Sequence, residues 1–547
     1  MALQFAHGAI QWLAADANTT VYTVSSLAFQ PKALRFYCMG VGSATDTSSE
    51  TLDLRRSVGF AVSTSDRRCV ASFDDDAAGT MICSSGLHEA AVVAIVDGSP
   101  AFTGLLDLNS ITSDGFTLIV DDQIPADITV FWEAWGGDIT VATTQSIAEP
   151  AATGNVDYTV TGFVAGAADQ VVMFAGVQST AAAGTAQRND SGLCVGYASS
   201  GAANDNIVIA DNQDDGSTTA DTDRYALSGE CLAMMALAGG NPSARAQMTQ
   251  YGTNNFRLNW IVRATTNRRY IAMAIKGGGW QVGEFTHDST TIGNTTTESG
   301  LLFQPKGILG FSATTTESVA GTSGTTGVMG LGTASSTSSR RSMGVHSENA
   351  TGSSASEVNL AIEYDEFIVI PSNAGGVLLA LDINAINSDG FQVITDVASA
   401  GTHWYGYLAF GDLPTRGRVS QVELEVPFVA TRGRVSFAEL EVPFVATRGR
   451  VSWAELEVPT VQTRGRVSWA EFEVPNAAGA TPTRGRVSWV EFEIPFVTTR
   501  GRVSLVEFEV PSVATRGRVS FIVLEVPDVG AGGGDGTGSR YWYWRSS

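Results

Sequence analysis

The chain has 547 residues and is acidic, with 33 Lys and Arg against 56 Asp and Glu and a formal net charge of −23. This balance disfavours nucleic acid and anionic membrane as partners, because both repel a negative surface. No apolar run approaches the roughly 20 residues that span a bilayer, and the first residues lack the basic start and long apolar stretch of a signal peptide. We therefore expect synthesis and assembly in the cytoplasm, without membrane insertion.

Short motifs near the start of the chain recur in the same order further on. Phe-Gln-Pro-Lys-Ala-Leu at residues 29–34 returns as Phe-Gln-Pro-Lys-Gly-Ile at 303–308, and Ser-Asp-Gly-Phe at 113–116 returns at 388–391. A more degenerate copy lies between them. The recurrence predicts three tandem domains of ordinary size, at 1–145, 146–285 and 286–412.

Strand-like patterns fill these domains. Alternating runs such as Phe-Thr-Leu-Ile-Val at 116–120 are separated by clusters of Gly, Ser, Thr, Asn and Asp, and helical periodicity is hardly visible. Many short strands without alternating helices favour an all-β fold of jelly-roll-like β-sandwiches. The five cysteines are irregularly spaced and odd in number, so no disulfide framework is expected, and no Cys-x-x-Cys pair suggests zinc.

Two arginine pairs are candidate binding or assembly residues. They follow matching Ser/Thr loops in the first and third copies, and they could meet an acidic or sugar partner or pack between domains, which is the interpretation we favour. The pairs are Arg67 with Arg68 and Arg340 with Arg341.

Metal and catalytic signals are weak. Asp211, Gln213 and Asp215 before Gly216 partly match a calcium loop, but the twelfth position is Thr222, so an acidic surface loop is favoured and no cofactor is expected. Glu133 among tryptophans resembles a glycosidase carboxylate without a partner, and the corresponding places in the other copies are Met273 and, nearby, Tyr405. We therefore expect no enzyme.

From 413 to 527 the chain repeats one 13-residue unit seven times, typically at a 16-residue spacing, as in Thr-Arg-Gly-Arg-Val-Ser-Trp-Ala-Glu-Leu-Glu-Val-Pro at 447–459. The Arg-Gly-Arg step suggests a turn, and the residues after it alternate like a strand. Such an array is quasi-one-dimensional and must stack on itself or on partner chains. The arginines and glutamates at fixed offsets favour a solvated, self-neutralising surface, with ion pairs between rungs or subunits as the alternative. The aromatic side chains of the repeats are candidate assembly residues, including Trp453, Trp469 and Trp489.

Residues 528–547 form a Gly-rich linker that leads to an aromatic tail. Four aromatic residues in a row suggest a docking segment, or a tail packed on its own chain. They are Tyr541, Trp542, Tyr543 and Trp544.

The recurring motifs of the three domains, Phe-Gln-Pro-Lys-Ala-Leu at 29–34 and Ser-Asp-Gly-Phe at 113–116, resemble those of β-sandwich modules in virion structural proteins of tailed bacteriophages. The array resembles phage structural repeats. The second domain departs from the opening motif, with Phe-Val-Ala-Gly at 163–166 in its place. The resemblance implies a virion protein, favouring a fibre or tail appendage that binds other virion proteins and a host surface glycan or protein. A homotrimer would leave no free strand edges. The alternatives are a capsid decoration or head-fibre protein, a carbohydrate-binding module and an extracellular filament subunit.

Overall fold

The computed structural model describes residues 2–51, 53–75, 80–165, 167, 169–199, 206–216, 221–235, 241–264, 268–313, 326–348 and 358–413, and beyond 414 the backbone of strands β33 to β47. These residues form strands joined by turns and no helix, which confirms the all-β prediction. No helix of the described part could therefore serve as a membrane span. The chain divides into two units, Met1–Leu413 and Pro414–Ser547.

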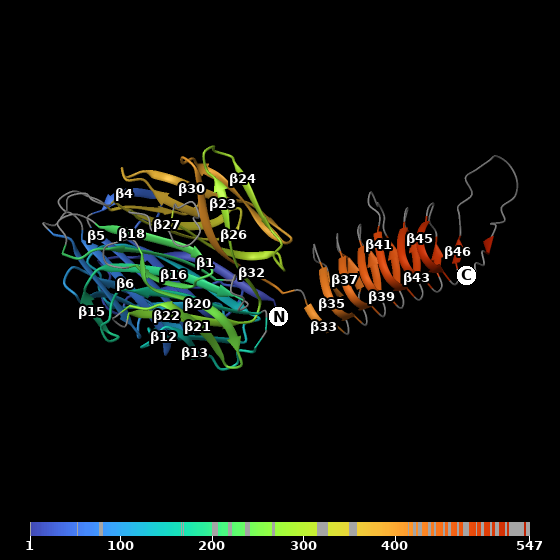
Figure 1. Cartoon of the computed structure of the whole chain (residues 1–547), viewed down its shortest axis with the longest axis horizontal. Helices are drawn as coiled ribbons and strands as arrows, with labels where there is room; N and C mark the ends of the chain where they lie inside the picture. Colours follow the sequence, from blue (N-terminus) through green and yellow to red (C-terminus); the bar gives the residue numbers. More distant parts are fainter. Residues whose placement is uncertain are drawn as a thin grey trace. The chain divides into compact units, whose positions relative to one another are not determined.

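The first sandwich has a larger and a smaller antiparallel sheet (Figure 1). The larger sheet has the order β1 (Leu3–Trp12), β11 (Ile128–Gly137), β3 (Pro31–Met39), β5 (Asp53–Ser63), β6 (Asp66–Asp75), β7 (Ile82–His88). The smaller sheet has the order β2 (Val21–Val24), β10 (Gly115–Asp122), β9 (Phe102–Thr112), β8 (Val93–Val96). In β10, Phe116, Leu118 and Val120 are buried while Thr117 and Ile119 between them are partly exposed, as expected of a half-buried strand.

The second and third sandwiches repeat this topology strand for strand. The second has larger-sheet strands β12 (Val141–Ala148), β22 (Arg269–Lys276), β14 (Gln170–Val177), β16 (Ser191–Ser199), β17 (Asn206–Gln213), β18 (Thr222–Ser228) and smaller-sheet strands β13 (Gly154–Thr159), β21 (Asn255–Val262), β20 (Pro242–Gly252), β19 (Leu232–Met235). The third has β23 (Gly279–Asp288), β32 (Thr402–Gly411), β25 (Pro305–Ser312), β26 (Gly327–Ser336), β27 (Ser339–Ser347), β28 (Val358–Glu363) and β24 (Thr295–Ser299), β31 (Gly390–Val397), β30 (Val377–Asn387), β29 (Ile368–Pro371). Strands β12 and β23 are the first strands of the second and third sandwiches, and they begin before residues 146 and 286. These two sandwiches therefore start earlier in the chain than the boundaries predicted from the sequence.

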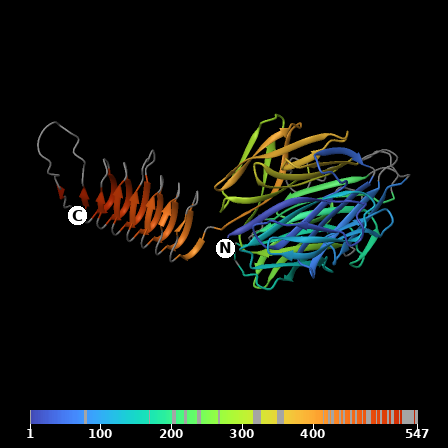
Figure 2. The same ribbon diagram turned by 180° about the vertical axis from the view of Figure 1, so that it is seen from behind.

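The three larger sheets bury their inner faces in one central core. This core joins Phe131 and Trp135 of the first sandwich to Met273 of the second and Phe410 of the third. The ring centroids of Trp135 and Phe410 are 5.7 Å apart. Outer faces pack on each sandwich's own smaller sheet in separate clusters. Larger-sheet strands such as β11 are therefore buried on both faces. Figure 2 shows the packed strands of this unit from behind.

Neighbouring sandwiches also exchange strands. β4 (Thr47–Thr51), in the connection between β3 and β5 of the first sandwich, extends the larger sheet of the third by pairing with β28. β15 (Thr185–Arg188), in the matching connection of the second, pairs with β7 of the first. The matching connection of the third contains residues 314–325, outside the described part, but Thr326 beside it accepts a hydrogen bond from Arg224 of β18. The direction of exchange is the same in the two pairings that the described residues show, and the contact of Arg224 with Thr326 joins the second sandwich to the third, so the sandwiches close into a ring.

The ends of the sandwiches are joined by the lysine of the repeated Phe-Gln-Pro-Lys motif. Lys306 Nζ donates to Leu3 O at 2.8 Å and lies 2.7 Å from the Asp412 carboxylate, which accepts from Leu3 N. Lys32 Nζ donates to Ile139 O at 2.7 Å in the corresponding place. The motif therefore marks the joints from the third sandwich to the first and from the first to the second.

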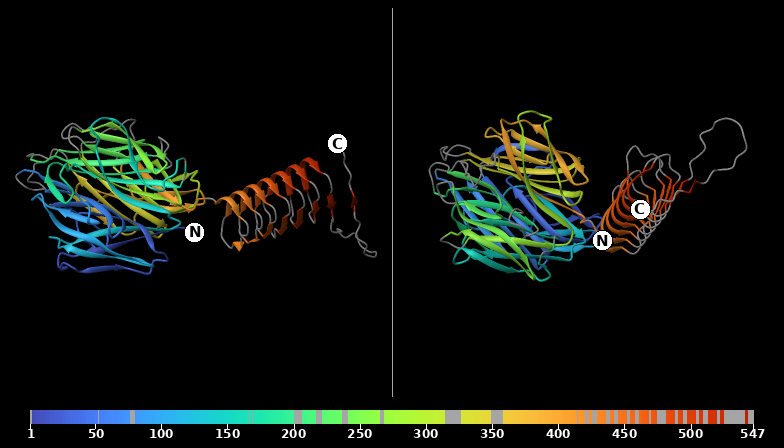
Figure 3. Two further views of the ribbon diagram at one scale, coloured as in Figure 1. Left: turned by 90° about the horizontal axis from the view of Figure 1, so that it is seen from below. Right: turned by 45° about the vertical axis from the view of Figure 1, so that its right-hand side comes forward.

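The array is a parallel two-sheet stack in which each repeat contributes one strand to each sheet (Figure 3). One sheet contains β33 (Thr415–Val419), β35 (Val429–Val435), β37 (Val445–Val451), β39 (Val461–Val467), β41 (Thr481–Val487), β43 (Val497–Val503), β45 (Val513–Val519). The other contains β34 (Glu423–Leu424), β36 (Glu439–Glu441), β38 (Ala454–Glu457), β40 (Ala470–Glu473), β42 (Val490–Glu493), β44 (Val506–Phe508), β46 (Ile522–Leu524), with β47 (Tyr541–Trp542) antiparallel at its end.

The prediction that Arg-Gly-Arg forms a turn is wrong. Arg448, Gly449 and Arg450 lie inside β37 and pair in register with the same residues of the neighbouring repeats. A 16-residue repeat holds two strands of this sheet pair, and parallel stacking gives the backbone of the step its hydrogen-bond partners in adjacent repeats.

Candidate functional sites at the sandwich interfaces

Arg67 and Arg340 hold the two sheets of their own sandwiches together. Arg67 of β6 makes a bidentate ion pair with Asp107 of β9, with Nε 2.5 Å from Oδ1 and Nη2 2.6 Å from Oδ2. Arg340 Nε lies 2.7 Å from Oδ1 of Asp382 on β30. Each Nε also donates to a backbone carbonyl, of Ala90 and of Asp365 respectively. The two arginines therefore occupy matching positions and are engaged within the chain.

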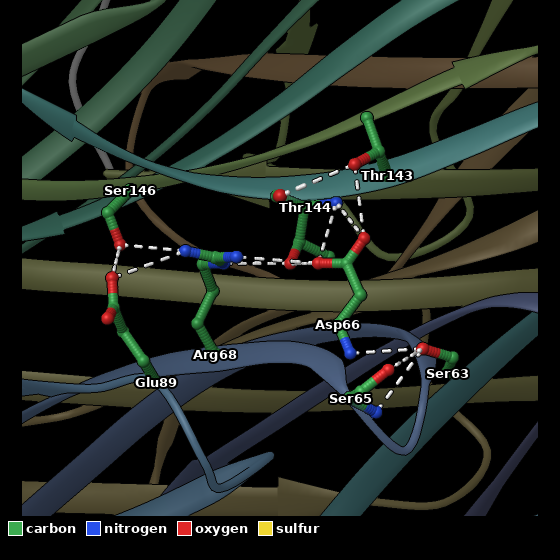
Figure 4. Close-up of polar contacts among 8 residues, drawn as sticks. All are labelled: Ser63, Ser65, Asp66, Arg68, Glu89, Thr143, Thr144 and Ser146. Carbon is green, nitrogen blue, oxygen red and sulfur yellow. Dashed lines mark hydrogen bonds and ion pairs between the residues drawn. The ribbon is translucent and has the colours of Figure 1, made fainter.

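Arg68 crosses from the first sandwich to the second (Figure 4). Its Nε donates to Thr144 Oγ1 at 2.8 Å and its Nη1 to Ser146 Oγ at 3.0 Å, both on β12. Asp66, at the start of β6, accepts from Thr144 Oγ1 at 2.5 Å. A polar seam thus fixes β6 against β12.

Arg341 makes the matching contact from the third sandwich to the first. Its Nη1 lies 3.0 Å from His7 Nδ1 and donates to His7 O at 3.3 Å. Since a guanidinium cannot accept, His7 Nδ1 is the acceptor, and Nε2 carries the proton toward Ser335 and Ser339. Burial, with Arg341 adding, lowers the pKa of His7 to about 3, so the imidazole is neutral near pH 7.

A buried polar cluster lies where all three sandwiches meet. Arg35 of β3 pairs with Glu133 of β11 at 3.0 Å, and their side chains are only 2% and 1% exposed. Thr333 of β26, in the third sandwich, donates to the Glu133 carboxylate. The Arg35 guanidinium lies 5.7 Å from the ring of Tyr197 of β16, in the second sandwich. The cluster therefore joins the three sandwiches inside the unit Met1–Leu413.

The pKa values of this pair follow from their burial. Burial alone would lower the pKa of Arg35, but the Glu133 carboxylate beside it raises it above its usual value. Burial raises the pKa of Glu133, and Arg35 and Thr333 oppose that shift. Enclosure of this carboxylate in an ion pair leaves it no open face for a sugar, which fits the structural role favoured from the sequence.

The other sandwiches carry apolar residues at the same register. Met173 faces Met273 in the second, and Leu309 faces Leu408 in the third, where Arg35 faces Glu133 in the first. Sequence reasoning placed Tyr405 near the third counterpart of Glu133, and the pairing register identifies Leu408 instead. It missed Arg35, although a charge directly after the Phe-Gln-Pro-Lys-Ala-Leu motif in a buried strand was a signal for it.

The calcium candidates are occupied by protein contacts. Asp211 pairs with the buried Arg56 of the first sandwich and accepts from Leu193 N. Asp215 accepts from Cys83 N and from Arg188. Gln213 is buried on β17 beside them. Asp211 and Asp215 therefore connect the first and second sandwiches, and Asp211 and Gln213 lie in a buried strand rather than in the acidic surface loop expected from the sequence.

The aromatic candidates fall mainly beyond the described part. Trp453, Trp469, Trp489, Tyr543 and Trp544 lie outside the described residues. Tyr541 and Trp542 form β47, whose backbone pairs with Leu524 and Val523. Their proposed contacts stay predictions.

No family model and no curated protein matches the chain. Among solved structures, the major capsid protein P2 from bacteriophage PM2 is similar at 7% identity over 50% of this chain and 98% of its own, with a TM-score of 0.17. The STIV MCP is similar at 8% identity over 51% of this chain and 98% of its own, with a TM-score of 0.16. Scores this low carry no argument about function.

Proposed function

We propose that the chain is a structural component of a phage virion, a fibre or tail appendage that contributes to assembly and host-surface attachment. The observation that carries the proposal is the ring of sandwiches, in which exchanged strands and a shared core turn three modules into one body. Charged residues such as Arg68 and Glu133 contact neighbouring modules. Such construction suits a mechanical part whose outer surfaces contact other virion proteins and a host glycan or protein.

The repeat array supports the same proposal. Its strands stack in register along one direction, as expected of a shaft or attachment segment. The strands pair within one chain, so closing their edges does not require three chains, and the proposed homotrimer must rest on other contacts.

A capsid decoration protein is the second candidate. The ring closes within one chain, through contacts such as Lys306 with Leu3, and so offers a self-contained body that one segment could tether. In this case the aromatic tail is the proposed tether.

Immunogold electron microscopy of virus particles whose genome encodes the chain tests the proposal. Label at the tail or its fibres would support the appendage, and label over the capsid would support decoration. Complete particles without label would overturn both. Light scattering on the full chain and on residues 1–412 then measures oligomerisation: a trimer that becomes a monomer on truncation assigns assembly to the array, and a monomer in both removes the homotrimer.

The absence of catalysis is also a proposal, and Glu133→Gln tests it. If the protein cleaves a host polysaccharide and this variant does not, the structural role proposed for Glu133 is wrong. Glu149→Gln is a control for general destabilisation, because Glu149 is also buried and accepts hydrogen bonds from Tyr270 and Ala264.

A further inference from the structure

Three carboxylates meet in the third sandwich at the place where Arg340 binds. Glu366 lies between β28 and β29, Asp382 is on β30 and Asp396 is on β31. One oxygen of each lies within 4.8 Å of one oxygen of each of the others. Glu366 is buried, Asp382 is partly buried and Asp396 is exposed, so the group opens to solvent on the side of Asp396.

Glu366 is buried against other carboxyl groups. The residue is 9% exposed, its hydrogen-bond partners are the carboxyl groups of Asp382 and Asp396, and its Oε2 is enclosed without a hydrogen bond from any described residue. Arg340 pairs with Asp382 at 2.7 Å. The groups that face Glu366 are carboxylates, which cannot donate unless they are protonated. An enclosed, ionised carboxylate without a donor is costly, so Glu366 requires either a bound proton or a positive counter-charge.

The first sandwich shows that the fold does not need this glutamate. Val92 N bonds to Leu106 O there as Phe367 N bonds to Leu381 O here, which places Ala91 at the position of Glu366. Asp107 and Asp121 match Asp382 and Asp396, and Arg67 keeps its pair with Asp107. The first sandwich therefore keeps its Arg–Asp pair with alanine at this position, and the matching pair of the third sandwich does not require Glu366.

We propose that Glu366, Asp382 and Asp396 bind a divalent cation, with Ca²⁺ favoured. Calcium takes six to eight oxygen ligands at about 2.3–2.6 Å in flexible geometry, so three carboxylate oxygens within 4.8 Å of one another can share one ion, whereas Mg²⁺ requires near-ideal octahedral geometry. The ion supplies the positive charge that Glu366 lacks, and exposed Asp396 gives it an entry path.

A second acidic group increases the local negative potential. Asp46, Glu363 and Asp365 also bring one oxygen each within 4.8 Å of the others, and Asp46 comes from the first sandwich, where it accepts from Tyr364 N. Burial and neighbouring carboxylates, among them Asp396, raise the pKa of Glu363. Burial, Asp382 and Asp396 raise the pKa of Glu366 in the same way. Near neutral pH the region thus takes up either protons or a cation, and the experiment must separate the two.

The test is calorimetric titration of CaCl₂ into the full chain after dialysis against EDTA, with melting curves in EDTA and in CaCl₂ at pH 7.5. We expect one equivalent of Ca²⁺ to bind and to raise Tm. Glu366→Ala, which copies Ala91, and Asp396→Asn at the exposed ligand should each lose this equivalent and the Ca²⁺-dependent rise.

Asp121→Asn in the first sandwich is the matched control for Asp396→Asn and should retain Ca²⁺ binding. If the wild type binds no Ca²⁺ and its Tm responds only to pH, protons hold the group and the proposal is wrong. Equal binding by Asp396→Asn and the wild type would also overturn it, because the ion would then lie elsewhere. Since Asp396 is exposed, this variant gives an answer even if Glu366→Ala does not fold.

Discussion

The sandwiches and the array are both built from repeated sequence, but their strands find partners in opposite ways. In the sandwiches the repeats close on themselves, because β15 pairs with β7 of the preceding module and β4 pairs with β28 of the last. In the array each strand pairs with its copy in the next repeat, as β37 does with β39. A closed set fixes the number of its members, whereas an open stack allows it to vary. The following predictions test that contrast.

The largest effect is expected at the centre of the ring. Glu133→Ala leaves the Arg35 guanidinium buried without its carboxylate, and removing one partner of a buried pair costs about 3–5 kcal/mol. Chemical denaturation of the full chain measures this loss in the free energy of unfolding.

The double variant Arg35→Met with Glu133→Met copies Met173 and Met273 of the second sandwich and is the control. It should fall near the wild type, because well-packed apolar residues often replace a buried ion pair without loss. If the double variant is as unstable as Glu133→Ala, the loss does not come from an unpaired Arg35. Apolar residues that suit this position in the second sandwich would then not suit it in the first.

A smaller effect is expected at the joints between sandwiches. Arg341→Ala removes hydrogen bonds from a charged donor to His7, at a cost of about 1.5–3 kcal/mol, measured in the same way. Arg68→Ala should cost less, because one of its partners, Glu89, is 48% exposed. A larger loss in the free energy of unfolding for Arg68→Ala than for Arg341→Ala would contradict this ranking.

Acid should weaken the joint at His7. The pKa of His7 falls from 6.5 to about 3 on folding, so below pH 6.5 the unfolded chain binds a proton that the folded chain does not. Stability contributed by neutral His7 is therefore present above pH 6.5 and is lost as pH falls toward 3. His7→Thr copies Thr144, which the pairing register places at the same position in the second sandwich. Melting temperatures from pH 7 to 4 should fall less steeply in this variant, and parallel curves would contradict the assignment.

The smallest effect is expected from shortening the array. Deleting residues 447–462 removes one complete period and joins Ala446 to Thr463, so the register of the remaining repeats is kept. Circular dichroism should show a lower strand signal and an unchanged melting transition for the sandwiches.

Deleting residues 447–454 instead removes half a period and should make the array sensitive to protease, because Ala446 then precedes Glu455 rather than Thr447. Equal protease resistance of the two deletions would mean that register does not hold the array together.

Two features could be predicted from the sequence: the all-β class, from alternating residues, and the repeated modules, from recurring motifs. The all-β class followed from runs such as residues 116–120, and the Phe-Gln-Pro-Lys motif marked positions that are joints in two places, at Lys32 and Lys306. Strand exchange was not predictable, because β4 has the polar sequence Thr-Ser-Ser-Glu-Thr and its partner β28 lies in another sandwich. The Arg-Gly-Arg error has a related cause: glycine suggests a turn locally, and only the stack of equal strands makes it part of a sheet.

The pairing of β4 with β28 also determines when the ring can close during synthesis. Asp46, next to β4, bonds to Tyr364, 318 positions later in the chain, and Leu3 bonds to Asp412. When the first sandwich leaves the ribosome, β4 and the outer edge of β1 have no counterpart until nearly the whole ring has been translated. Contacts between such distant residues form late and slowly. A chain interrupted before residue 358 therefore lacks β28, the strand with which β4 pairs, and cannot close the ring.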